Sequence, residues 1–141
     1  MNDILQLGFL RRFSDLALLA ARIAVGAFLV WGVWDNIVSA ERMAEFAAFL
    51  QHFGFPWPSV LAPVSVWVQF ACGIAFMLGL LTRWAGLLCA ATFIIALIMV
   101  DAQSGVRAAW PATALVLFGL YFATAGAGRL ALDSLFPRPK S

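Results

Sequence analysis

The chain is poor in charged side chains and in the residues that bind metals or carry redox groups. Only 11% of its 141 residues are charged, and it has one histidine and two cysteines. A single histidine excludes bis-histidine ligation of haem within the chain, and no cysteine–histidine cluster of the zinc type is present. No glycine-rich phosphate loop follows a strand, so a nucleotide cofactor is not expected. The sequence therefore predicts neither a metal site nor an intrinsic cofactor.

Apolar residues fill the composition instead. They make up 64% of the chain, and the mean hydropathy is +0.95. Globular domains usually carry about 25% charged residues and cannot hide this much apolar surface from water. We therefore expect an integral membrane protein, with residues 1–141 forming a single membrane domain. The net charge of +2 reflects membrane topology rather than affinity for nucleic acid.

Four apolar stretches are long enough to cross a bilayer, which takes about 20 residues. They are expected near residues 16–34, 63–81, 84–100 and 108–126. Between the first two, residues 41–53 place apolar side chains on one helical stripe, which predicts a short helix at the membrane interface. The predicted fold class is all-α, a four-helix transmembrane bundle with this interfacial helix between spans one and two.

Basic residues lie mostly on one side of the predicted membrane. Four spans place both termini and the second–third turn on the same side. That side holds Arg11, Arg12, Arg83, Arg129, Arg138 and Lys140, and the other side holds Arg42 and Arg107. By the positive-inside rule, both termini are expected in the cytoplasm.

Arg22 lies inside the first span and is the most informative residue of the chain. A guanidinium at membrane depth costs about 2.5–3.5 kcal/mol, so it needs a partner or a polar cavity. At about 1.5 Å per residue, Arg22, Thr92 and Tyr121 share a level, with Gln69 above them. These four residues form the predicted ligand-binding site. In the alternative interpretation, Arg22 reaches the headgroups and no site is needed.

A second polar group is expected at the opposite membrane boundary. Asp35 and Asn36 end the first span there and Asp101 ends the third, so they could bind a cation or relay protons. The alternative is that they are solvated helix ends. Cys72 and Cys89 are expected to pack as small apolar residues rather than to form a disulfide. Small residues in the first two spans are expected to let the helices pack closely: Gly26, Gly32, Gly73 and Gly79.

Several segments, in order along the chain, carry a family resemblance. They are Arg22–Phe28, Phe46–Leu50, Gly54–Pro56, Gly79–Arg83 and Gly126–Asp133. Together they resemble the DoxX family of small four-helix membrane proteins. The resemblance implies a helical membrane bundle, a bacterial inner-membrane location and a link to quinone-dependent thiosulfate oxidation and membrane oxidoreductase complexes.

The chain departs from that family pattern at three places. Gln69 stands where many relatives have a glutamate, and Asp101 stands where a histidine is common. Trp31–Asp35 replaces a frequent His-Gly-x-x-Lys. Because Gln69 cannot neutralise Arg22, a proton-coupled mechanism does not carry over, and Asp133 becomes a candidate counter-charge.

The leading hypothesis is a small or accessory subunit of a membrane redox system, with catalysis left open. Its polar pocket would bind a quinone or another lipophilic molecule, and its partners would be the bilayer, a redox protein and a second copy. The alternative is a structural or assembly scaffold that docks a partner through residues 41–53 or the basic tail. A small transporter or channel is a third hypothesis, although the spans offer no carboxylate at the midplane.

Overall fold

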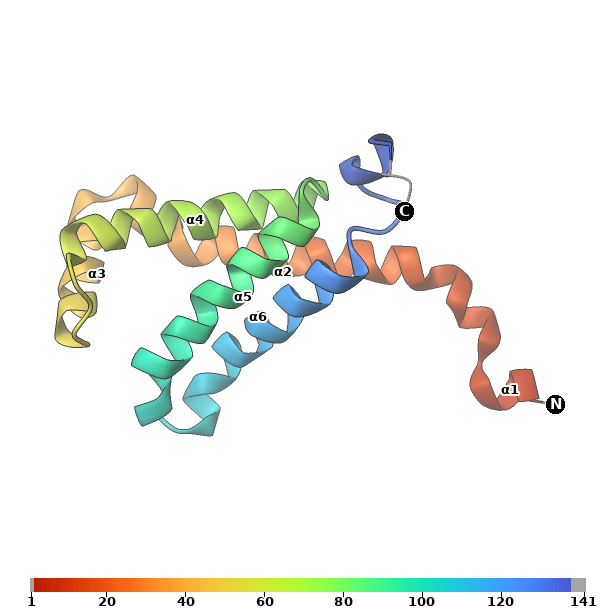
Figure 1. Cartoon of the computed structure of the whole chain (residues 1–141), viewed down its shortest axis with the longest axis horizontal. Helices are drawn as coiled ribbons and strands as arrows, with labels where there is room; N and C mark the ends of the chain where they lie inside the picture. The colour runs from red at the N-terminus through yellow and green to blue at the C-terminus, as the bar shows by residue number, and fades with distance from the viewer. Residues whose placement is uncertain (1, 138–141) are drawn as a thin grey trace.

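The computed structural model describes residues 2–137, which form helices and no strands. Each of the four long helices is apolar and long enough to cross a membrane. They are α2 (Ser14–Val38), α4 (Pro58–Leu78), α5 (Thr82–Met99) and α6 (Val106–Ala125). The predicted all-α fold with four spans is therefore confirmed (Figure 1). Arg138 and Lys140, which contribute to the predicted basic tail, lie outside the described residues.

Shorter helices flank and connect the spans. Before α2 come α1 (Asn2–Gln6) and the 3₁₀ helix η1 (Gly8–Phe13). The helix α3 (Ala40–His52) matches the expected interfacial helix, and the Ser39 side chain caps it by accepting a hydrogen bond from the Arg42 amide at 3.3 Å. Two further 3₁₀ helices are η2 (Asp101–Gln103) and η3 (Leu132–Leu135).

The second span differs from its predicted limits. It begins at Pro58 rather than Pro63, and it ends at Leu78, followed by Gly79 at φ +69°. Pro58 suits the first turn of a helix, where an amide N–H has no intrahelical partner. Gly79 adopts the left-handed conformation that commonly ends helices, so residues 79–81 form a turn rather than the last turn of the span.

The spans are arranged as two packed pairs. Helix α2 lies along α4, and α5 lies along α6, with a smaller contact between α4 and α5. Figure 1 shows the α5–α6 hairpin running at an angle to the α2–α4 pair. Each pair meets at facing glycines: a Cβ added to Gly26 would lie 2.5 Å from the Gly73 carbonyl oxygen, and one added to Gly86 would lie 2.5 Å from that of Gly119. The missing side chains allow the backbones to approach this closely.

The core lies where the two pairs meet. The rings of Phe76 and Phe122 contact edge to face with centroids 4.9 Å apart, and both residues are fully buried with Leu29. Large apolar side chains such as Trp31 and Trp84 point outward instead. This distribution is what a membrane protein requires, because lipid replaces water around its outer surface.

Candidate functional site

Arg22 is fully buried and bonded to backbone carbonyls. Its Nη1 donates to the Phe76 carbonyl at 3.0 Å, and its Nη2 donates to the Leu130 carbonyl. Phe76 lies in the last turn of α4, and its carbonyl also accepts from the Gly79 amide at 3.2 Å. Arg22 therefore joins α2 to the end of α4 and to the C-terminal segment, residues 126–137.

Asp133 caps the beginning of α5 from that C-terminal segment. Its two carboxylate oxygens accept from the Leu81 amide at 2.7 Å and the Thr82 amide at 2.9 Å. Its own amide donates to the Gly79 carbonyl at 2.9 Å. Amides at a helix start have no intrahelical acceptor, so a carboxylate here serves as an N-cap supplied by a distant part of the chain.

Two further side chains complete this arrangement. Arg83 donates to the carbonyls of Ala123 at 3.1 Å and Thr124 at 2.8 Å, at the end of α6. Asp15, at the start of α2, accepts from the Arg129 amide at 3.2 Å. We call Asp15, Arg22, Arg83 and Asp133 the turn-end cluster, since Arg83 connects the start of α5 to the end of α6 and the other three connect helices to the C-terminal segment.

Removing the Asp133 carboxylate is expected to destabilise the protein. In Asp133→Ala the Leu81 and Thr82 amides lose their acceptor, which should cost about 0.5–2 kcal/mol of unfolding free energy. Hydrogen exchange in detergent should show faster exchange at these two amides. Exchange in α3, which lies away from the turn, serves as the internal control. Unchanged exchange at Leu81 and Thr82 would contradict the capping role.

Backbone carbonyls, rather than a carboxylate, are the direct partners of Arg22. Among the side chains of residues 4–137 the ion pairs closer than 4.0 Å are Arg42–Glu45 and Arg129–Asp15, so Asp133 does not pair directly with Arg22. The Nε of Arg22 is buried and has no hydrogen-bond partner. The charge is thus held by carbonyl dipoles, with Asp133 on the same turn bound to amides.

The structure does not connect Arg22 to the other predicted ligand-binding residues. Gln69 donates to the Leu29 carbonyl at 3.2 Å, and the Thr92 hydroxyl donates to the Leu88 carbonyl of its own helix at 2.8 Å. Tyr121 is 51% exposed on the outside of α6. Among the described residues, no hydrogen bond joins Arg22 to any of these three.

The residues of the expected outer polar site lie at different elements and have different partners. The Asn36 side chain donates to the Arg42 carbonyl at 3.1 Å and so ties the end of α2 to α3. Asp35 is exposed, and Asp101 begins η2. Over residues 2–137, no group of three or more histidine, cysteine or acidic side chains is placed to hold a metal ion.

Both cysteines are buried and form no disulfide. Cys89 contacts the Leu115 carbonyl with its Sγ at 3.8 Å, and both Cys72 and Cys89 belong to the apolar core. This environment is consistent with their expected packing role.

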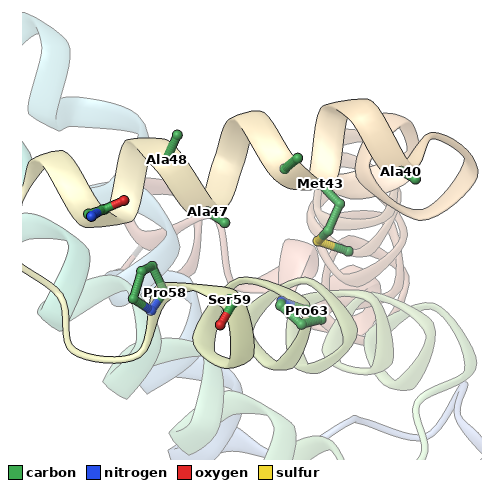
Figure 2. Close-up of a pocket in the computed structure, with 9 residues that line it drawn as sticks. Ala40, Met43, Ala47, Ala48, Pro58, Ser59 and Pro63 are labelled. Carbon is green, nitrogen blue, oxygen red and sulfur yellow. The ribbon is translucent and has the colours of Figure 1, made fainter.

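Two hollows lie on the surface of the bundle. The first, of about 450 Å³, is a groove between α3 and the beginning of α4. Figure 2 shows Met43 and Ala47 of α3 pointing toward α4, where Pro58, Ser59 and Pro63 form the other wall. The second hollow, of about 300 Å³, lies on α6 and is lined by Trp110, Ala114, Leu117, Phe118 and Tyr121.

The four spans and the turn-end cluster define a small helical integral membrane protein whose buried charge holds its helix ends together. The chain belongs to the DoxX family, because the DoxX family model matches residues 17–102, more than half of its length. That match covers α3, α4, α5 and most of α2, and it ends before α6 and the C-terminal segment. Searches of curated proteins and of solved structures find no match.

Proposed function

We propose that the protein is a non-catalytic membrane scaffold, an accessory subunit that holds a partner protein of a membrane redox system. The observation that supports this proposal is that the guanidinium of Arg22 is already bound by groups of the protein. Its guanidinium is fully buried and bonded to the carbonyls of Phe76 and Leu130. A cation used in this way stabilises the bundle and is not presented to a ligand. The redox setting is the one that the family resemblance implies.

The groove between α3 and α4 supports a protein-binding role. On α3 the exposed Ala40, Ala44 and Ala48 follow one another at intervals of four residues and line this groove. Residues four apart lie on one face of a helix, and small side chains let a second helix approach closely. We therefore test the groove as the surface that binds the partner protein.

The test compares two tryptophan variants of the tagged, full-length protein. Ala44→Trp fills the groove, and Ala108→Trp adds the same side chain at an exposed position of α6. After mild extraction from the native membrane, we expect wild type and Ala108→Trp to retain one stoichiometric partner bearing a flavin or an iron–sulfur centre. Ala44→Trp should retain it about tenfold less, equivalent to about 1.4 kcal/mol.

Two results would contradict the scaffold. One is equal retention of that partner by Ala44→Trp and wild type. The other is the absence of any stoichiometric partner from the wild-type preparation. Thermal unfolding of both variants shows whether the substitutions leave the bundle intact, and a photo-cross-linker at position 44 locates the contact.

The hollow on α6 favours a second candidate, the binding of a quinone-like molecule. Its aromatic wall includes Trp110 and Phe118, and the Tyr121 hydroxyl can donate to a carbonyl oxygen. Native mass spectrometry of the same preparations tests it. A quinone that is retained by wild type and lost in Tyr121→Phe would favour this candidate over the scaffold.

A further inference from the structure

Positive charge gathers at the end of the bundle where the α4–α5 turn lies. Arg11 and Arg12 in η1 are exposed, and the side chain of Arg129 is 88% exposed. Asp15 and Asp133, at the same end, accept hydrogen bonds from backbone amides. Asp133 is thus engaged at the start of α5 and Asp15 at Arg129, whereas Arg11 and Arg12 are exposed.

Apolar side chains accompany the two arginines of η1. Phe9, Leu10 and Phe13 are each between 45% and 58% exposed, and the Arg12 guanidinium carbon lies 4.9 Å from the centroid of the Phe13 ring. Figure 1 shows this segment projecting from the bundle at the end away from α3. A short segment with exposed arginines and exposed apolar groups matches the chemistry of the headgroup–acyl boundary.

The length of the first helical stretch favours a place for η1 at that boundary. The stretch extends over Gly8–Val38, which is 31 residues. A span needs about 20, so about ten residues are surplus to the hydrocarbon core. Because Ser14 begins the regular helix, the preceding 3₁₀ turns at Gly8–Phe13 form part of this surplus, and Arg11 and Arg12 are expected at the depth of lipid phosphates.

We propose that η1, together with Arg129, binds anionic phospholipids. Arg11 and Arg12 would hold the phosphodiester, while Leu10 and Phe13 lie among the upper acyl carbons. The planar guanidinium matches two phosphate oxygens at once, and the negative headgroup complements the positive end of the bundle. Arg129 joins the same surface because Asp15, two residues after Phe13, contacts it. The inference is independent of the scaffold.

The experiment measures lipid preference with the full-length protein in phosphatidylcholine bilayers. Spin-labelled phosphatidylglycerol and spin-labelled phosphatidylcholine report the relative association constant by electron spin resonance. We expect wild type to prefer the anionic lipid. Arg11→Gln/Arg12→Gln should lower that preference by up to about fivefold for each arginine removed, and added salt should weaken it in wild type.

A matched double variant controls for the loss of two charges. Arg42→Gln/Arg107→Gln removes two arginines from α3 and the start of α6, at the opposite end of the bundle, and should keep the wild-type preference. Equal affinity of wild type for the two lipids would overturn the proposal. Equal loss in both double variants would do the same, because the preference would then follow net charge rather than η1.

Discussion

Arg22→Leu is expected to produce one of the two largest losses of stability among single substitutions in this protein. The Leu130 carbonyl would lose its donor and the Phe76 carbonyl would keep only the Gly79 amide at 3.2 Å, and a hydrogen bond to a charged group contributes about 1.5–3 kcal/mol. We expect the free energy of unfolding to fall by about 2–4 kcal/mol and the thermal midpoint to fall by roughly 10 °C. Thermal unfolding in mild detergent measures this change.

Two further variants serve as comparisons for the stability of Arg22→Leu. Arg22→Lys should lie between wild type and Arg22→Leu, because one ammonium cannot match the planar fork that serves two carbonyls. Arg107→Leu removes an exposed arginine from the first turn of α6 and should change stability by less than about 0.5 kcal/mol. Arg22→Leu as stable as wild type would mean that the guanidinium does not hold the helix ends together.

Gly26→Ala is expected to separate α2 from α4. The new Cβ would lie 2.5 Å from the Gly73 carbonyl oxygen and 2.6 Å from the Met77 Cγ. The carbonyl belongs to the backbone and cannot move without shifting the helix, so the cost should be that of overpacking, about 1–3 kcal/mol. The measurement is again thermal unfolding, with the yield of folded protein as a second readout.

Gly32→Ala, in the same helix, is the matched control. Its Cβ would meet only the Gln69 Nε2 within 4 Å, at 3.3 Å, and this side-chain end needs to shift by only a few tenths of an ångström, which its hydrogen bond to the Leu29 carbonyl can accommodate. Alanine also favours a helix over glycine by up to about 1 kcal/mol. Gly32→Ala should therefore be neutral or slightly stabilising. Equal destabilisation by both alanine substitutions would show that the close Gly26–Gly73 contact is not the cause of the loss.

The four spans could be predicted because length and apolar content decide them. Their limits depend on local backbone chemistry that hydropathy does not report. Pro63 was expected to begin the second span, yet it lies within α4 because Pro58 takes the first turn. Leu81 was placed inside the span, whereas the left-handed Gly79 ends the helix before it.

The partners of Arg22 could not be predicted in the same way. The sequence suggested a polar side chain as the partner, but the partners are backbone carbonyls. Every residue has a carbonyl, so composition does not show which of them bind Arg22. Depth along the helix placed Tyr121 level with Arg22 without fixing its rotation. One position changes the direction by about 100°, and it is Phe122 that faces the core. The Gly126–Asp133 pattern marked the correct segment, but not the amides that Asp133 caps.

The hydrogen bond from Arg22 to Leu130 spans 108 positions of the chain, and this separation has a consequence for biosynthesis. At about 5–20 residues per second, a ribosome needs roughly 5–20 s to pass from one residue to the other. During that interval the nascent first span carries a cation without its final acceptors. Until Leu130 is made, this charge must interact with the insertion machinery, water or lipid phosphates.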